Sequence, residues 1–330
     1  MKTVDVHAHV LLPEIERAVA GMPGHAGHRE LDALRNGPES LEVSGRMVGE
    51  RIPRLTRVPA RLADMDAAGI DAQIVSPSPS HYHYWADRDL ARTVWTLANE
   101  GTAAHCAQAP DRLHGLGLVP LQHPDLAVEA LDHAMACGLK GVEISSHAPG
   151  RELSDPDLEP FWTRAESHGA VVFVHPFGCT LDERLDRWYL SNIVGQPVEN
   201  AVALSHLIFS GVLDRHPALK VVAAHGGGYL PAHLGRADHG WRVRPEARGC
   251  AEPPSSYVRR LWFDSLVHDA AALRALLGAA GTGRVVLGSD HPFDMGDDHP
   301  LDLIRDVLPP GPDRDAVTGG NAAALFDLKD

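Results

Sequence analysis

The stretch TVDVHAHV, residues 3–10, guides the interpretation of the whole chain. It is rich in valine and predicts a β-strand over residues 3–7. The strand runs into His7-Ala8-His9, and residues two apart in an extended chain point to the same side. Both imidazole rings can therefore reach one point beyond the end of this strand.

Seven further short apolar runs follow, and helical stretches separate them. The predicted strands span residues 71–76, 115–119, 141–145, 171–175, 220–225, 261–265 and 284–289. The predicted helices span residues 61–68, 87–107, 126–136, 158–168, 198–210 and 270–277. Most of the strands are rich in Val, Ile, Leu or Ala, which is typical of strands buried on both faces of a parallel sheet. Eight strands alternating with helices favour a (β/α)₈ TIM barrel over a doubly wound open sheet.

The length of 330 residues suits a single barrel domain over residues 1–330 whose loops carry insertions. The connection after the first strand is too long for a plain loop and contains the Gly- and Pro-rich piece GMPGHAGHRE. We therefore expect a small insertion, roughly residues 10–58, over the carboxyl ends of the strands. A second long connection runs from residue 176 to about residue 199.

The composition excludes some classes of partner. The formal net charge of −14 argues against nucleic acid and anionic membranes, which select basic surfaces. No run of 18 apolar residues is present, and the first residues read as a strand, not as a signal peptide. Four cysteines lie far apart without a CxxC pair, and we expect reduced thiols and a cytoplasmic location. They are Cys106, Cys137, Cys179 and Cys250.

The candidate site residues fall at the predicted ends of four strands. His7 and His9 follow strand one, His175 ends strand five, His225 ends strand six, and Asp290 follows strand eight. In a TIM barrel these strand ends face the active site. Three imidazoles and a carboxylate suit Zn²⁺, and Fe²⁺ or Mn²⁺ would accept similar ligands. The sequence therefore predicts one divalent ion held by His7, His9, His175 and Asp290, with His225 as the acid–base residue.

Each of these residues also has an ordinary structural explanation. An HxH pair can lie on a strand edge, His175 can merely end a strand, His225 can be a core histidine, and Asp290 can cap a turn. Their joint placement on four strand ends is harder to explain in that way. The three glycines after His225 lack the pattern of a phosphate loop, and we interpret them as permissive backbone close to the metal.

One metal ion is favoured over two. A two-metal version of such a site commonly needs a bridging ligand, often a modified lysine, from strand four. Strand four here reads GVEISS and has no lysine at its end. Glu143 is a possible substitute, although its side chain need not face the barrel mouth.

The ordered set HxH at 7–9, VHP at 174–176, AHGGG at 224–228 and GSDHPF at 288–293 resembles the signature of the amidohydrolase superfamily. Over nearly the whole chain, the sequence is similar to the amidohydrolase-2 branch of metal-dependent decarboxylases, in particular the 2-amino-3-carboxymuconate-6-semialdehyde decarboxylase-like family. The similar stretches include VDVHAHVLLPE, LADMDAAGIDAQIVSPSP and FDSLVHD. The resemblance implies the same four ligands and His225 as the catalytic residue. Asp290 is also predicted to be catalytic, because in a hydrolytic reaction it would shuttle protons together with His225.

The resemblance also implies two arginines that bind the substrate carboxylate. Arg236, in GRADHG, matches an arginine that reaches the site of a neighbouring subunit, which implies a homodimer. Its ordinary alternative is a surface ion pair with Asp238 or another acidic residue. The second arginine is expected from the insertion, where Arg46 is the best match and Arg51 the nearby alternative.

The chain departs from the family at two positions close to the substrate. Phe177 replaces a tryptophan, and Asn192 replaces another aromatic residue. The metal chemistry therefore transfers better than the identity of the substrate. Phe177 and Phe293 complete the predicted substrate-binding set.

The implied reaction is the non-oxidative decarboxylation of a small unsaturated or aromatic carboxylic acid. The main alternative is hydrolysis of an ester, lactone or amide by the same metal site, and a hydratase of an unsaturated dicarboxylate is a third possibility. A non-catalytic barrel that serves as a scaffold is disfavoured, because it leaves a complete metal shell and a free histidine without a role.

Overall fold

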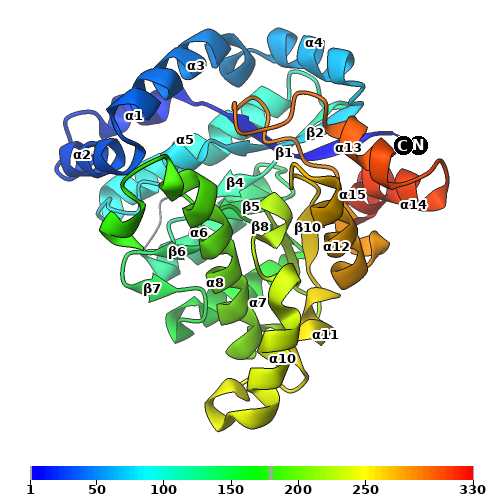
Figure 1. Ribbon diagram of the computed structural model, residues 1–330. Helices are drawn as coiled ribbons and strands as arrows, with labels where there is room; N and C mark the ends of the chain where they lie inside the picture. Colours follow the sequence, from blue (N-terminus) through cyan, green and yellow to red (C-terminus); the bar gives the residue numbers. More distant parts are fainter. Residues whose placement is uncertain (1, 178–180, 330) are drawn as a thin grey trace.

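The computed structural model describes residues 2–177 and 181–329. Within these ranges, eight parallel strands lie close to the predicted positions (Figure 1). They are β1 (Val4–Val10), β2 (Ala72–Pro77), β3 with β4 (Leu113–Gly115 and Gly117–Leu118), β5 (Gly141–Ile144), β8 (Val171–Val174), β9 (Lys220–Ala223), β10 (Trp262–Asp264) and β11 (Val285–Val286). The third strand is interrupted at Leu116 and begins two residues earlier than the sequence predicts.

Hydrogen bonds join the strands into a closed barrel. One sheet has the order β1-β2-β3, and the other has the order β11-β10-β9-β8-β5-β4. The two sheets meet at the interrupted strand, where the Leu116 N–H donates to the Val75 carbonyl over 2.9 Å. On the opposite side, the Val6 N–H donates to the Leu287 carbonyl over 2.9 Å. The predicted (β/α)₈ barrel is therefore confirmed.

Helices surround the barrel on the outside (Figure 1). The six predicted helices are α4 (Val58–Ala68), α5 (Arg88–Cys106), α6 (Pro124–Ala136), α7 (Glu159–His168), α8 (Gln196–Phe209) and α12 (Ala270–Ala280). Shorter helices are α9 (Val212–Arg215), α11 (Pro254–Val258), α13 (Pro300–Val307), α14 (Pro312–Asp315) and α15 (Asn321–Leu325). The helices bury apolar residues against the strands, as α7 does with Phe161 and Trp162.

A second hydrophobic cluster fills the interior of the barrel. Val6 of β1, Phe173 of β8 and Val222 of β9 belong to it, together with Phe326. Phe326 follows α15, and the same cluster contains Val4 at the start of β1. The C-terminal segment therefore closes the amino end of the barrel, and polar residues are left to line the carboxyl end.

The insertion after β1 consists of three helices, α1 (Pro13–Val19), α2 (His25–Asn36) and α3 (Pro38–Thr56). They form an arc along one side of the barrel (Figure 1). Arg51 of α3 donates to the Pro292 carbonyl, and the Ser191 hydroxyl donates to the Arg35 carbonyl over 3.4 Å. The insertion thus contacts the loops that follow β8 and β11 at the mouth of the barrel.

Two features were not predicted from the sequence. The connection after β9 carries a helix, α10 (Leu234–Val243), that projects from the body of the molecule (Figure 1). A hairpin of β6 (His147–Ala148) and β7 (Arg151–Glu152) follows β5. The hairpin pairs only two residues in each strand, which is too short for an alternating pattern to be visible.

In the part of the chain that the structure describes, no helix combines the length and the apolar character needed to cross a membrane. Cys106, Cys137 and Cys250 are free thiols, as expected. Cys179 lies outside the described residues.

Candidate metal centre

A bulge in β1 brings its two histidines into the barrel. Three steps along β1 face only two along β2, so β1 carries one extra residue. The bulge lies between Asp5 and Ala8 and therefore contains Val6 and His7. Val4 and Val6 pack with Phe173 inside the barrel. His7 and His9 also face the interior, and the His7 ring lies 5.0 Å from the Phe173 ring. Bulges commonly re-aim side chains next to active sites, and this one allows apolar residues and histidines to face the same interior.

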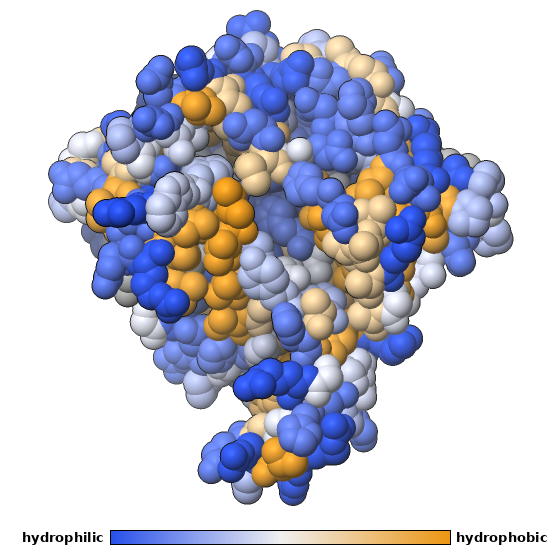
Figure 2. All heavy atoms as spheres, viewed as in Figure 1, coloured by the Kyte–Doolittle hydropathy of each residue, from blue (hydrophilic) through white to orange (hydrophobic). Residues whose placement is uncertain are grey.

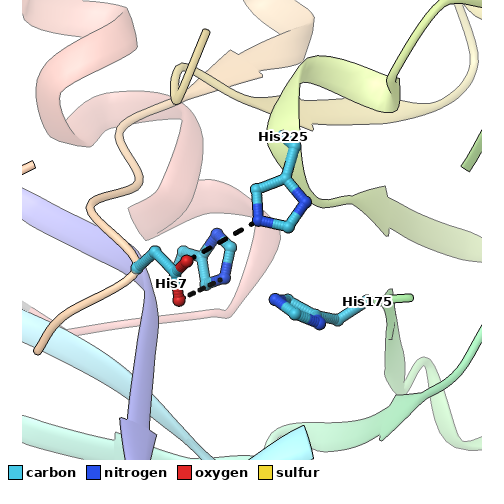
Figure 3. Close-up of side chains that lie close together, drawn as sticks. His7, His175 and His225 are labelled. Atoms are coloured by element: carbon cyan, nitrogen blue, oxygen red, sulfur yellow. Dashed lines mark ion pairs between the residues drawn. The ribbon is translucent and has the colours of Figure 1, made fainter. Parts of the chain in front are cut away.

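Five side chains meet at the mouth of the barrel. The ring centroids of His7, His9 and His175 are 4.9 to 5.1 Å apart. Asp290 Oδ1 lies 3.4 Å from His7 Nε2 and 3.1 Å from His9 Nε2. His225 approaches from β9, and its Nε2 lies 3.7 Å from Asp290 Oδ2. Figure 3 shows the rings of His7, His175 and His225 converging on a common space.

The free electron pairs of this cluster fit a bound cation. Across residues 2–177 and 181–329, His7 Nε2, His9 Nε2, both ring nitrogens of His175, and Asp290 Oδ1 are buried without a hydrogen-bond partner. Unpaired buried polar atoms are costly, so such a concentration calls for an explanation. Three imidazole nitrogens and one carboxylate oxygen form a ligand set for a divalent transition metal.

Both His9 and His225 lie close enough to the other three residues to be considered as the fourth ligand. Ligand atoms of His7, His175, His225 and Asp290 all lie within 4.8 Å of one another. However, His9 faces the same carboxylate oxygen as His7, whereas His225 faces the other oxygen. The His9 side chain is 0% exposed and that of His225 is 20% exposed. This asymmetry favours His9 as a ligand and leaves His225 facing the open side of the site.

The electrostatic environment keeps these groups in their ligand forms. Burial lowers the pKa of His175 well below its usual range, and the neighbouring His225 lowers it further, so the ring is neutral. Burial alone would raise the pKa of Asp290, but His7, His225 and His9 together lower it well below the usual value. A neutral imidazole and an ionised carboxylate are the forms that bind a metal.

The backbone at the two catalytic candidates is unusual. His225 and Asp290 have φ values of 52° and 57°, in the left-handed region that most side chains avoid. Such conformations persist where the surrounding structure enforces them, often at functional sites. The glycines that follow His225 allow this tight approach, since a Cβ on Gly228 would lie 2.0 Å from the Pro197 carbonyl oxygen. The interpretation of these glycines as permissive backbone is consistent with this packing.

A family model described as Amidohydrolase matches residues 4–328 of the chain. The chain belongs to the amidohydrolase family. The 2-amino-3-carboxymuconate-6-semialdehyde decarboxylase of Dictyostelium discoideum is 32% identical over 329 residues, which cover 98% of this chain and 91% of the relative. The crystal structure of 5-carboxyvanillate decarboxylase from Sphingomonas paucimobilis superimposes with a TM-score of 0.84 at 25% identity and covers 99% of each chain.

A third similar protein was crystallised with a metal ion. The 5-carboxyvanillate decarboxylase of Novosphingobium aromaticivorans contains bound manganese and 3-methoxy-4-hydroxy-5-nitrobenzoic acid. It is 24% identical to this amidohydrolase, with a TM-score of 0.84 over 99% of this chain and 97% of that one. At this level of identity, the likeness supports the barrel fold.

Two buried carboxylates of this amidohydrolase lie directly behind the histidines. Asp264, at the end of β10, lies 2.6 Å from His7 Nδ1. Glu143, in β5, accepts a hydrogen bond from the Ser76 hydroxyl. The same hydroxyl lies 3.2 Å from His9 Nδ1. Burial raises the pKa of Glu143. Glu143 therefore lies behind His9, next to the expected ligands.

Sequence reasoning assigned no role to Asp264. The signal was available, because Asp264 lies near the carboxyl end of the predicted strand 261–265, as Asp290 lies just after another strand. What the sequence did not reveal is that the Asp264 carboxylate points at His7, which is 257 residues away in the chain.

The two predicted aromatic residues differ in their distance from the cluster. Phe293 packs beside it, with its ring 5.3 Å from the His9 ring. Phe177 lies further out, with ring contacts of 6.2 Å to Tyr82 and 6.5 Å to His28 of the insertion. Asn192 lies in the loop before α8, in a π-helical turn. Phe293 therefore contacts a member of the cluster, and Phe177 contacts the insertion.

The two candidate arginines of the insertion, Arg46 and Arg51, lie in different surroundings on α3. The Arg46 side chain is 65% exposed, and its ion-pair partner is Glu42, one turn earlier in α3. Arg51 instead reaches the mouth and donates to the Pro292 carbonyl, two residues beyond Asp290. The reason is helical geometry, since residues five apart on a helix point in different directions and only one of the two faces the barrel.

Arg236 does not make the surface ion pair that was considered for it. The Asp238 carboxylate instead accepts hydrogen bonds from the backbone N–H and the hydroxyl of Ser255, at 2.9 and 2.8 Å. Arg236 is exposed on α10, and among the described residues it has no ion-pair partner. Within this chain it does not reach the cluster at the barrel mouth.

A second group of potential ligands, Glu16, His81 and His83, does not form a comparable centre. The Leu12 N–H donates to His81 Nε2 over 3.0 Å, so Nε2 carries the lone pair and Nδ1 carries the proton. His81 Nδ1 lies 3.3 Å from the Glu16 carboxylate. This contact is an ordinary histidine–carboxylate pair, and a metal at Nδ1 would require His81 to give up its backbone bond.

Proposed function

We propose that this amidohydrolase is a metal-dependent decarboxylase that removes the carboxyl group of a small unsaturated or aromatic acid without oxidation. The observation that carries the proposal is the meeting of His7, His9, His175 and Asp290 beside a fifth, more open residue, His225. The space-filling view shows a hollow in the middle of the face that carries this site, between the insertion and α8 (Figure 2). A hollow of this kind suits a small substrate.

In the proposed mechanism, His7, His9, His175 and Asp290 hold the metal ion, and His225 transfers the proton. When bound, a divalent cation supplies Lewis acidity, which holds and polarises the oxygen atoms of the acid. Protonated His225 gives its proton to the carbon that bears the carboxylate. The bond from that carbon to the carboxyl group then breaks, its electron pair restores the conjugated system, and CO₂ leaves. Neutral His225 recovers a proton from solvent, and Asp290 Oδ2, 3.7 Å away, stabilises the charged ring.

Zn²⁺ is the metal that we propose, with Fe²⁺ and Mn²⁺ as alternatives. Three imidazoles and one carboxylate suit zinc, but manganese accepts the same donors. Metal analysis of protein purified without chelators will identify the native ion. A cytoplasmic location and a single domain over residues 1–330 remain predictions of the sequence.

A panel of acids and esters tests the proposed reaction. We expect the metal-loaded protein to release CO₂ from at least one aromatic or conjugated acid, with one molecule of decarboxylated product for each CO₂. Headspace CO₂ analysis together with chromatography of the product provides the measurement. Release of an acid from an ester, lactone or amide, with no CO₂ from any carboxylic acid, would instead show a hydrolase.

We also propose that the active form is a homodimer in which Arg236 of each subunit serves the site of the other. Three observations support this arrangement: α10 projects from the body, Arg236 is exposed, and its neighbour Asp238 is already occupied by Ser255. An exposed arginine on a projecting helix is available to bind a carboxylate outside its own subunit.

Mixing two inactive variants tests the shared site. Arg236→Ala and His225→Ala homodimers should each be nearly inactive. After the subunits are unfolded and refolded together, about one quarter of wild-type activity should return, because half of the dimers are mixed and one of their two sites is complete. If each site uses its own Arg236, mixing will restore nothing, and a monomer in sedimentation experiments would also contradict the proposal.

A further inference from the structure

Asp264 is a buried carboxylate on which four hydrogen-bond donors converge. Its Oδ1 accepts from the backbone N–H groups of Gly226, at 2.8 Å, and Leu266, at 3.2 Å. Its Oδ2 accepts from the backbone N–H of His225, at 2.9 Å, and lies 2.6 Å from His7 Nδ1. The side chain is 0% exposed. The acceptor capacity of the carboxylate is therefore filled by the protein itself.

These contacts determine which nitrogen of His7 carries the proton. A carboxylate oxygen can only accept, so His7 Nδ1 must carry the hydrogen. His7 Nε2 is then left with its lone pair directed at the proposed metal position, and it has no other partner among the described residues. A carboxylate behind a histidine also makes that ring a stronger electron donor to a metal.

The same carboxylate also holds the backbone of the acid–base residue. The N–H groups of His225 and Gly226 both point to Asp264, and both residues have a positive φ, 52° and 60°. His225 is not a glycine, so this conformation needs support from outside the turn. Asp264 supplies that support, because it binds two successive N–H groups at the point where the chain reverses.

The other ligand of the HxH pair has a different arrangement. His9 Nδ1 faces the hydroxyl of Ser76 at 3.2 Å, and its nearest carboxylate oxygen, on Glu143, is 3.8 Å away. Of the two histidines, only His7 has a carboxylate within hydrogen-bonding distance of its Nδ1 atom. That carboxylate is also the one that contacts the His225 backbone.

We propose that Asp264 is a positioning residue that couples the two halves of the site. It fixes the tautomer of the ligand His7, and it fixes the backbone of the acid–base residue His225. The Asp264 side chain is 0% exposed, so it is closed off from the space where substrate would bind. The inference rests on the proposed metal site, but it does not depend on which reaction the site performs.

The Asp264→Asn variant provides the sharpest test, because it preserves the shape of the side chain. If the amide NH₂ group of the introduced asparagine faces Gly226 and Leu266, it meets two backbone N–H donors and can bond to neither. If it faces His225 and His7, it meets only one such backbone donor, because His7 can change tautomer and accept a hydrogen bond at Nδ1. The second orientation is therefore favoured, and it moves the His7 proton to Nε2, the atom that should bind the metal.

We expect the dissociation constant for Zn²⁺, measured by competition with a chromogenic chelator, to rise by about 10- to 100-fold in Asp264→Asn. At saturating Zn²⁺ the metal content should recover, while kcat stays at least about tenfold below wild type because the His225 backbone is no longer held. The thermal midpoint of the metal-free protein, measured in parallel, reports on folding alone. If Asp264→Asn does not fold, Asp264→Ser should show the same loss, because its hydroxyl can still accept from one backbone N–H but is too short to reach His7.

Glu199→Gln provides a matched control. Glu199 is 2% exposed and lies 3.2 Å from His147 Nδ1, so it is also a buried carboxylate paired with a histidine. This variant should keep the wild-type affinity for Zn²⁺. The proposal would be overturned if a folded Asp264 variant bound Zn²⁺ with wild-type affinity. It would also be overturned if Glu199→Gln lost as much affinity for Zn²⁺ as the Asp264 variants do. A wild-type protein that binds Zn²⁺ but releases no CO₂ would contradict the decarboxylase proposal and leave the role of Asp264 intact.

Discussion

The His9→Ala variant should lose its metal ion and, with it, all measurable turnover. In the wild-type protein, His9 Nε2 and His7 Nε2 face the same oxygen, Asp290 Oδ1. Removing the His9 ring leaves three ligands and a cavity in place of the fourth donor. The Lewis acid that holds the substrate would then be absent, which removes the basis of catalysis. Metal content by mass spectrometry, together with the rate on the best substrate of the acid panel, provides the measurement.

A surface histidine serves as the control for the His9 experiment. His206→Ala removes a partly exposed histidine whose ring contacts Ser154 and Glu152, away from the barrel mouth. It should keep full metal content and activity. A His9→Ala protein that still binds one equivalent of metal would remove His9 from the ligand set and favour His225 in its place.

The His225→Ala variant should show the opposite pattern, with the metal retained and turnover lost. We expect kcat to fall by about 10²- to 10⁴-fold, which is the usual contribution of a positioned acid–base group. The metal should remain, because His225 faces Asp290 Oδ2 and not the oxygen that His7 and His9 share. Metal analysis and a kcat determination at saturating substrate separate the two effects.

Comparison of His9→Ala with His225→Ala distinguishes the metal ligand from the proton donor. His225 is near enough to His7, His175 and Asp290 to be a ligand itself. If it is a ligand, the His225→Ala protein will lose its metal as His9→Ala does. A near-normal kcat in His225→Ala would instead contradict the assignment of His225 as the proton donor.

The alternation of a strand was enough to place His7 and His9 on one side, because that rule is local and needs only an extended backbone. The ends of strands one, five, six and eight could be related to each other because a parallel barrel brings all its carboxyl ends to one face. The predicted cluster of His7, His9, His175, His225 and Asp290 therefore followed from strand positions alone.

Other parts of the site depend on directions that the sequence does not encode locally. The bulge in β1, which allows Val6 and His7 to face the same interior, arises from the register between β1 and β2. The different surroundings of Arg46 and Arg51 depend on how α3 is rotated against the barrel. A pattern of residues along one segment does not specify either quantity, because each is set by packing against another segment.

The sequence by itself determined the type of barrel and the atoms available for a metal, since both follow from periodicity and from the chemistry of side chains at strand ends. Only the tertiary structure decided which carboxylate lies next to His7 Nδ1 and which oxygen of Asp290 faces which histidine. It also decided that Arg236 is exposed on α10. The physical reason is that contacts between residues distant in the chain, such as His7 and Asp264, are fixed by the closure of the barrel and leave no local trace in the sequence.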